Sequence, residues 1–319
     1  MKKNKFLIIF ARKFWIWYWI KLMNGFAPSD LYGNYKRPQG IKKENRKSGV
    51  NSQNTQNLYL LIGSTCPWCH RTFLMYRLKN LSKIINIIFL NPRYQDGEWI
   101  FKEHFFGMKT LSEVYSKTKL NIISRPTLPI LISFKNQRIE PISNESSEIV
   151  KILNKIGDDQ NTKRTKIIDD SEQLLSLIHN SINDGVYKCG FARNQSAYEK
   201  ASKNLFSSLD KVDDILKNNG GPWVLGEELS LADIYLFPTL VRWELIYSIL
   251  FKCTEKDISE YKNITRWRSK FFNLKEVRET CFEKEWMQDY YRALFPLNPN
   301  QIIPLTSSLE KTITYEFRD

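Results

Sequence analysis

The chain has 319 residues, of which 42% are hydrophobic and 26% charged, a globular composition with enough length for one or two domains. Five cysteines are too few for a disulfide scaffold and indicate a reducing compartment, so we predict a cytoplasmic protein without structural disulfides. The formal net charge is +14, and residues 1–50 hold 12 Lys and Arg against 2 Asp and Glu. Basic and aromatic residues do not alternate beyond that region, so the charge does not predict nucleic-acid binding.

The first 23 residues, MKKNKFLIIFARKFWIWYWIKLM, hold two apolar runs, Phe6–Ala11 and Phe14–Ile20. Neither run reaches the roughly 18–20 residues that a membrane-spanning helix needs. The first is also too short for a signal peptide and is followed by Arg12 and Lys13. Such a density of aromatic residues also occurs in segments that bind a membrane surface. We predict instead that this segment packs on the body of the protein, without membrane association.

Residues 24–57 are rich in turn-forming and polar residues, so we predict an N-terminal extension, residues 1–57, that ends in a loop-like lead-in. Apolar runs then predict strands at 58–63, 83–90, 127–133 and 137–143, and helical patterns cover 67–81 and 144–153. Residues 91–124 are predicted as a long connection. The order of these elements is that of a thioredoxin-like domain, which we predict over residues 58–156.

A polar linker, residues 157–165, separates this domain from a region without strand patterns. Helical periodicity covers 166–183, 195–218, 230–250, 259–273 and 276–293. Ser230 and Asp233 have the spacing of a capping box at the start of one of these helices. We therefore predict an α/β thioredoxin-like N-terminal domain plus an all-α C-terminal domain over residues 163–293, with a tail at 294–319.

The stretch GSTCPWCHRT holds the strongest candidates for catalytic or metal-binding residues. Cys66 and Cys69 have the spacing of a redox or nucleophilic thiol, a zinc half-site or a c-type haem attachment site. Haem attachment would require export, for which we see no convincing signal. Zinc needs more ligands than three scattered histidines and distant cysteines provide, so we predict no metal. Two inert, buried cysteines are a further alternative.

Cys66 is predicted to lie between the end of a strand and the start of a helix. There the free helix N–H groups and the helix dipole lower a thiol pKa and supply the thiolate that nucleophilic chemistry needs. Cys69 lies one helical turn further on and either resolves a disulfide with Cys66 or only packs, and both roles stay open.

Two further positions support a thiol site. Pro129 begins the third predicted strand, where thioredoxin-like folds place a cis-proline opposite the cysteine. Glu145 and Ser146 lie at a strand-to-helix turn, where the helix N-terminus and the acid suit the carboxylate and ammonium of a γ-glutamyl group. Ordinary helix capping is the alternative for these two residues.

Together these motifs resemble the glutathione transferase superfamily, and most closely its xi class, the glutathionyl-hydroquinone reductases. The resemblance runs from about Trp17 to Pro304 and is carried by CPWCHRT, LMNGFAPSDLYGNYKRP, DGEWIF, RPTLPIL, SNESSEI, NDGVYKCGFA, LADIYLFPTLVRWELIY, FKC and YYRALFPLNPNQIIP. Two departures stand out: Cys69 replaces the alanine common in the class, and YYRALF stands where the class often has YYGSH. The second places Arg292 and Phe295 near the expected substrate pocket.

The resemblance implies a glutathione transferase fold, a homodimer, and glutathione as co-substrate. Cys66 would attack the sulfur of a glutathionyl-hydroquinone or related aromatic conjugate, and a second glutathione would regenerate it. The implied glutathione-binding residues are Leu128 and Pro129 at the cysteinyl backbone, Glu145 and Ser146 at the γ-glutamyl group, Trp99 in packing and Arg125 at the glycyl carboxylate. The implied residues of the aromatic-substrate pocket are Tyr187 and one of the pair Tyr290 and Tyr291.

Two alternative functions remain. One is an omega- or glutaredoxin-like deglutathionylase of small or protein mixed disulfides. The other is a non-catalytic glutathione transferase-like binding protein, against which the intact cysteine motif argues, because a scaffold needs no thiolate.

Overall fold

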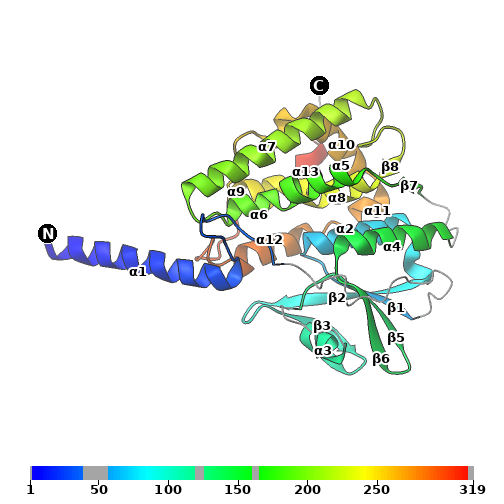
Figure 1. The fold of residues 1–319 in the computed structure, drawn as a ribbon, viewed down its shortest axis with the longest axis horizontal. Helices are drawn as coiled ribbons and strands as arrows, with labels where there is room; N and C mark the ends of the chain where they lie inside the picture. The colour runs from blue at the N-terminus through cyan, green and yellow to red at the C-terminus, as the bar shows by residue number, and fades with distance from the viewer. Residues whose placement is uncertain (1, 39–56, 119–125, 160–164, 315–319) are drawn as a thin grey trace.

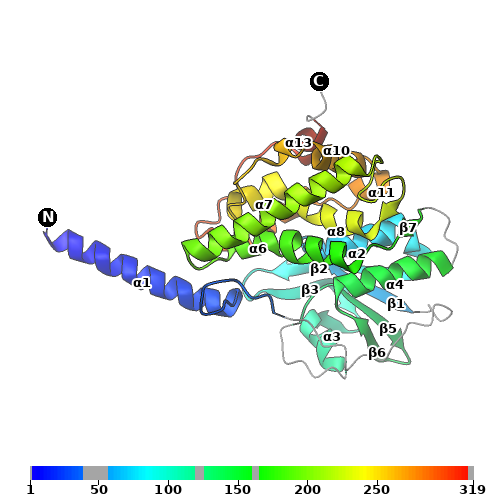
Figure 2. The ribbon, with the colours of Figure 1, turned by 45° about the horizontal axis from the view of Figure 1, so that its top comes forward.

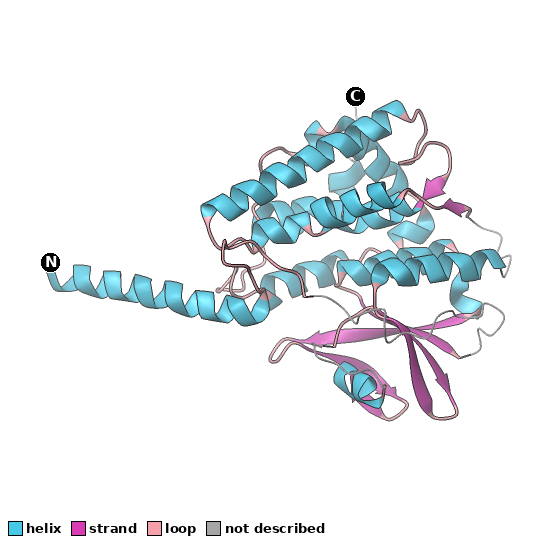
Figure 3. Ribbon diagram, viewed as in Figure 1, coloured by secondary structure: helices cyan, strands magenta, loops and turns pink. Residues whose placement is uncertain are grey.

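The computed structural model describes residues 2–38, 57–118, 126–159 and 165–314. A sheet-containing part and a helical part pack against each other, and one long helix projects away from both (Figures 1 and 3).

The sheet has six strands in the order β4-β3-β2-β1-β5-β6. The strands are β1 (Leu58–Gly63), β2 (Ile85–Arg93), β3 (Glu98–Phe105), β4 (Met108–Thr110), β5 (Ile130–Lys135) and β6 (Arg138–Ser143). β1 pairs with β2 in parallel, and all other neighbours are antiparallel. Helices α2 (Pro67–Leu78) and α4 (Ser146–Asp159) cover the face toward the helical part, and α3 (Leu111–Lys117) lies beyond the other face (Figure 1). β1 is apolar throughout because it is central and covered on both sides.

The predicted strands and helices of this part are confirmed with shifted ends, but the long connection predicted at 91–124 is wrong. It contains β3, β4 and α3. The sequence signal for β3 is weak because Phe101 and Phe105 are its only fully buried side chains, and the charged residues between them are exposed. A strand near the edge of a sheet needs no continuous apolar run.

The helical part begins after β7 (Ile167–Ile168), which pairs in parallel with β8 (Leu229–Ser230), a two-residue strand directly before α8. Its helices are α5 (Glu172–Leu177), α6 (Gly185–Gly190), α7 (Gln195–Asn218), α8 (Leu231–Leu240), α9 (Ser248–Leu250), α10 (Lys262–Phe272), α11 (Lys275–Arg278), α12 (Glu283–Ala293) and α13 (Leu309–Thr314). The capping box of Ser230 and Asp233 at the start of α8 is confirmed.

Two predicted helices are interrupted by π-helical turns, Ile178–Asn183 and Trp243–Tyr247. In each turn a backbone N–H bonds five residues back, from Asp184 to His179 and from Tyr247 to Arg242. The apolar residues stay buried through both turns, so periodicity alone does not reveal them. The pairing of β7 with β8 and the helices α6 and α13 were also not predicted. The helix predicted at 276–293 is divided into α11 and α12 by residues 279–282.

Helix α1 (Lys2–Phe26) extends away from the body in both views (Figures 1 and 2). Only its base is attached: Met23 is buried, and the indole N–H of Trp19 donates to the carbonyl of Pro296 at 2.8 Å. The side chains at positions 5–18 are all exposed. The prediction that this segment packs on the body is therefore wrong beyond the base. No helix in the described ranges is long and apolar enough to cross a membrane.

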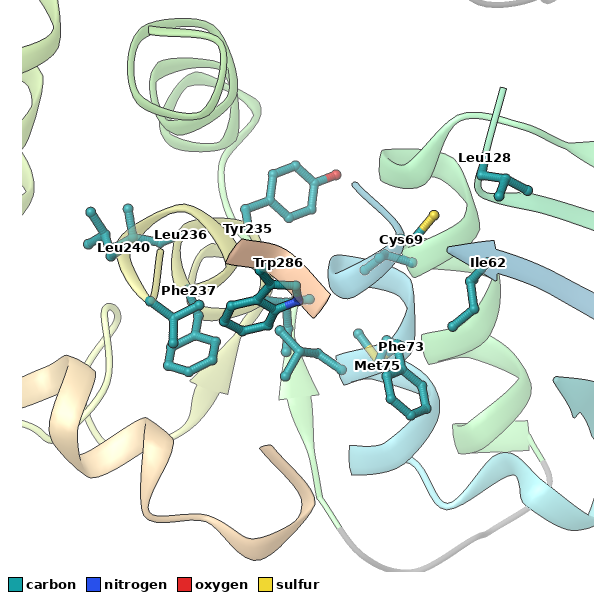
Figure 4. Close-up of a cluster of buried hydrophobic side chains, with 14 of the residues drawn as sticks. Ile62, Cys69, Phe73, Met75, Leu128, Tyr235, Leu236, Phe237, Leu240 and Trp286 are labelled. Atoms are coloured by element: carbon teal, nitrogen blue, oxygen red, sulfur yellow. The ribbon is translucent and has the colours of Figure 1, made fainter. Parts of the chain in front are cut away.

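α2 joins the two parts of the molecule. In Figure 4, Cys69 lies on the side of α2 toward Ile62 and Leu128, while Trp286 of α12 and Phe237 of α8 lie on the opposite side. The indole N–H of Trp286 donates to the carbonyl of Ser64, in the loop before α2, at 2.9 Å. This loop is therefore held from the helical part as well as from β1.

Candidate functional site

Cys66 is the N-cap residue of α2, directly after the β1–α2 loop, with extended backbone angles. Its carbonyl accepts the first helical bond, from His70 N–H at 2.9 Å. The side chain is half-buried, and its thiol lies 3.9 Å from the carbonyl oxygen of Leu128, to which it donates. Pro67 at the first helical position has no N–H, so the sulfur faces the amides that follow it.

The surroundings of Cys66 favour its thiolate. Its pKa is lowered from 9.0, first by a hydrogen bond from the Cys69 thiol, then by the backbone N–H groups of Cys69 and Trp68 and by the charge of Arg37, with burial opposing. Cys69 is fully buried, and burial raises its pKa well above 9.0, so it stays a thiol at neutral pH. The N–H of Gly63 donates to the Cys69 sulfur at 3.3 Å. Both cysteines are free.

The segment opposite Cys66 has a cis peptide bond between Leu128 and Pro129, as predicted. Both residues precede β5, and the pairing of β1 with β5 begins at Leu61 and Ile130. The backbone of Leu128 therefore lies next to the Cys66 sulfur but outside the ladder between the two strands, where an extended peptide can approach it.

Glu145 and Ser146 lie at the start of α4, as predicted. The Glu145 carbonyl accepts from the N–H groups of Glu148 and Ile149, so Glu145 occupies the cap, and its side chain is half-buried. Ser146 is buried, and its hydroxyl accepts from Arg71 at 3.2 Å. The turn thus presents a helix N-terminus, an acid and a hydroxyl, which are the groups that bind a zwitterionic amino-acid end.

Arg71 connects this turn to the helical part. It is buried, and its second terminal nitrogen donates to the Asn183 side chain at 2.7 Å. Its guanidinium also lies 3.9 Å from the ring centre of Tyr235. Burial lowers its pKa to about 10, so it remains a cation at neutral pH.

Trp99 lies on β3, half-buried, with its ring on Gly63 at the end of β1. A Cβ atom on Gly63 would lie 2.4 Å from the Trp99 ring, so this close approach requires glycine. Trp99 therefore sits beside the loop that carries Cys66. The predicted residue Arg125 lies outside the described residues.

Three tyrosines from different helices meet in the helical part. The hydroxyls of Tyr187 and Tyr290 are 2.6 Å apart, and those of Tyr247 and Tyr290 are 3.1 Å apart. Burial raises the pKa of all three, to well above 10 for Tyr187 and Tyr290, so they remain hydrogen-bond donors at neutral pH. The ring centres of Tyr187 and Trp68 are 6.5 Å apart, so this cluster lies close to the start of α2. We call Tyr187, Tyr247 and Tyr290 the tyrosine cluster.

Tyr291 is not part of the tyrosine cluster. It is buried, and its hydroxyl donates to the carbonyl of Leu245 at 3.0 Å. The neighbouring departures from the family pattern, Arg292 and Phe295, are both exposed.

Sequence reasoning did not single out Tyr247, Arg71 or Arg37. The Arg37 guanidinium lies 3.7 Å from the ring centre of Trp68 and pairs with Asp184 at 2.8 Å. It reaches the site from the segment predicted as a loop-like lead-in. Only its position in LMNGFAPSDLYGNYKRP, one of the stretches that carry the family resemblance, pointed to it.

A narrow crevice lies between the start of α2 and the helical part. Its lining includes Pro67 and Trp68 of α2 and Tyr187, Tyr235 and Pro238 of the helical part. In the described parts of the chain, no three His, Cys, Asp or Glu side chains gather in a way that could hold a metal ion.

Comparison with protein families gives two matches. Residues 65–156 match the family model of the glutathione S-transferase N-terminal domain, and residues 195–269 match that of the C-terminal domain. Among characterised relatives, glutathionyl-hydroquinone reductase PcpF of Sphingobium chlorophenolicum is 33% identical over 259 residues, covering 77% of this chain and 82% of its own. Glutathionyl-hydroquinone reductase YqjG of Escherichia coli is 32% identical, covering 77% and 78%.

Solved structures give the same result. The structure of the glutathione S-transferase Xi from Phanerochaete chrysosporium superposes with a TM-score of 0.77 at 27% identity, covering 88% of this chain and 94% of that one. The glutathione-bound structure of YqjG from Escherichia coli superposes with a TM-score of 0.70 at 29% identity, covering 87% and 91%.

Proposed function

Because the chain belongs to the xi class of the glutathione transferase superfamily and is a glutathione-dependent enzyme with that fold, we propose that it removes glutathione from glutathionyl-hydroquinones or related aromatic conjugates. The observation that carries the proposal is the Cys66 thiol at the start of α2, with a lowered pKa, 3.9 Å from the Leu128 carbonyl.

In the first step, the Cys66 thiolate attacks the sulfur of the conjugate. A disulfide forms between Cys66 and glutathione, and the bond between sulfur and the ring carbon breaks. The bonding electron pair stays on the ring carbon, which takes up a proton, so the hydroquinone leaves reduced. The Cys69 thiol stabilises the attacking thiolate before this step.

In the second step, a second glutathione thiolate attacks the glutathione sulfur of the mixed disulfide. Oxidised glutathione leaves, and the Cys66 thiolate returns. The net reaction consumes one conjugate and one glutathione and yields one hydroquinone and one oxidised glutathione. Glutathione supplies both electrons, so no metal is needed.

We assign glutathione to the sheet-containing part of the candidate site. Leu128 and Pro129 pair with its cysteinyl backbone, Glu145 and Ser146 bind its γ-glutamyl group, Trp99 packs against it, and Arg125 meets its glycyl carboxylate. The tyrosine cluster binds the hydroquinone oxygens. Its protonated phenols donate hydrogen bonds and a proton as charge develops on the ring.

The test is intact-mass analysis of the purified protein after incubation with a glutathionyl-hydroquinone. We expect a gain of one glutathione on Cys66, release of the hydroquinone, and loss of the adduct when free glutathione is added. Turnover without such an adduct in single-turnover conditions contradicts the mechanism. The homodimer remains a prediction, which sedimentation velocity of the full chain tests.

A second function has support from Cys69. A buried thiol beside Cys66 is suited to an omega- or glutaredoxin-like deglutathionylase, and a relative from Schizosaccharomyces pombe that is 30% identical over 269 residues is named glutathione S-transferase omega-like 2. Faster turnover of a hydroxyethyl–glutathione mixed disulfide than of a glutathionyl-hydroquinone would favour this function over the first.

A further inference from the structure

Helix α1 has an exposed apolar surface that the proposed function does not use. Its exposed large apolar side chains are Phe6, Leu7, Ile8, Ile9, Phe10, Phe14, Trp15, Ile16, Trp17, Tyr18 and Ile20. Several of these rings contact one another along the helix, such as Phe14 with Tyr18 at 6.2 Å between ring centres. A surface of this kind on a protein marks a site of interaction with a partner or a membrane.

The charges on α1 are all positive. Residues 1–29 contain six Lys and Arg and no Asp or Glu, and the first acid in the chain is Asp30. At 100° per residue, the side chains of Lys5, Arg12, Lys13 and Lys21 all fall in one half of the helix circumference. About 180° of the circumference is left without charge, and Leu7, Ala11, Phe14, Trp15 and Tyr18 occupy this charge-free face.

From this arrangement we propose that α1 lies on the surface of a membrane that contains anionic lipids. The charge-free face enters the boundary between headgroups and acyl chains, where tryptophan and tyrosine are favoured. The flanking basic residues contact lipid phosphates, because their long side chains extend past the apolar surface to the headgroups. The six positive charges favour anionic over neutral lipid.

Two observations argue against a protein partner for the exposed surface of α1. A second copy of α1 would bring a like-charged helix against this one, since no acid is present to pair with its lysines. The body of the same molecule is excluded by the direction of the helix, which leads away from it (Figures 1 and 2).

The attachment of α1 to the body would carry the enzyme to the membrane surface with it. At the base, Arg193 lies 5.3 Å from the ring centre of Trp19, and Met23 is buried. Arg193 also donates to the Ala27 carbonyl at 2.6 Å, just after the helix. Helix α1 is therefore held to the body at its base. Substitutions in its exposed part do not change the residues of the candidate functional site.

The test is co-sedimentation of the full chain with vesicles of phosphatidylcholine containing about 30% phosphatidylglycerol, compared with pure phosphatidylcholine. We expect binding to the anionic vesicles that falls at least about tenfold in the triple variant Phe14→Ser, Trp15→Ser, Tyr18→Ser. The matched control is Ile9→Ser with Ile16→Ser, on the half that carries the basic residues, and it should reduce binding less. Arg12→Glu with Lys13→Glu should remove the preference for anionic lipid.

Circular dichroism and thermal melting check that each variant is folded, independently of its enzymatic activity. Equal reduction by the triple variant and its matched control overturns the assignment of a face. Absence of binding to the anionic vesicles overturns the proposal. If the chain also shows concentration-dependent self-association that the triple variant abolishes, a second copy of the chain is the partner of α1.

Discussion

The sheet-containing part and the helical part contribute to the candidate site in different ways. On the sheet-containing side, Cys66, Leu128 and Glu145 each lie at a turn next to a strand or helix end, and most of their chemistry comes from the backbone. On the helical side, the tyrosine cluster draws single hydroxyls from three helical segments far apart in sequence. The first arrangement depends on short local motifs, whereas the second depends on how helices pack.

The sharpest test of the sheet-containing side is Cys66→Ser. Loss of the thiolate should lower turnover by about a thousandfold or more, while glutathione still binds, because its proposed contacts lie elsewhere. Turnover and calorimetric titration with glutathione measure the two effects. Cys281→Ser is the control, since Cys281 is half-buried and its thiol donates to Val277. Equal losses in both variants would contradict the assigned role of Cys66.

The helical side can be tested with two adjacent tyrosines. Tyr290→Phe removes the hydroxyl at the centre of the tyrosine cluster and should lower turnover by about 10- to 100-fold, because Tyr187 and Tyr247 remain. Tyr291→Phe removes a buried hydrogen bond to Leu245 and should cost about 1 kcal/mol of stability with turnover nearly unchanged. Steady-state kinetics and urea unfolding measure both variants. The reverse pattern would place the substrate at Tyr291.

The role of Cys69 is tested by pH. The lowered pKa of Cys66 means that its thiolate fraction, and the rate, rise with pH with a midpoint below pH 9.0. Cys69→Ala removes the largest cause of this lowering, so the rate profile should move to higher pH, with a several-fold loss at neutral pH that higher pH restores. Thiolate absorbance and rate measure the shift. Complete loss at every pH would instead indicate that a disulfide with Cys69 is required.

Two glycines test the contact between Gly63 and Trp99. Gly63→Ala places a methyl group against the Trp99 ring and should cost about 1–3 kcal/mol of stability and weaken glutathione binding. Gly25→Ala, in the exposed helix α1, has no atom within 4 Å of the new methyl group and should change stability by less than about 0.5 kcal/mol. Urea unfolding compares the two. Equal effects would mean that the Trp99 ring moves freely.

The difference between local motifs and helix packing also explains which parts of the site the sequence could predict. The CPWC motif, the proline of TLPI and the acid-serine pair before α4 each have a local signature, so their places in the fold were predicted, and the cis bond at Pro129 was confirmed. Tyr247 has no such signature. It ends a π-helical turn, and that turn leaves the apolar pattern of an ordinary helix intact.

Helix α1 shows a different limit. Its aromatic residues are those of a buried segment, and the sequence alone does not say whether protein or another apolar phase covers them. Arg71 was missed for a related reason, because a buried arginine and an exposed one look the same in a sequence. Its partners, Ser146 and Asn183, lie 75 and 112 residues away.

Arg71 gives the molecule a thermodynamic linkage that neither half has alone. One guanidinium binds the hydroxyl at the start of α4 and the amide of the π-helical turn that leads to Tyr187. A ligand that competes for the Ser146 hydroxyl therefore alters the restraint on that turn. By reciprocity, any factor by which such a ligand alters binding at that turn is the factor by which binding at the turn alters the affinity for that ligand.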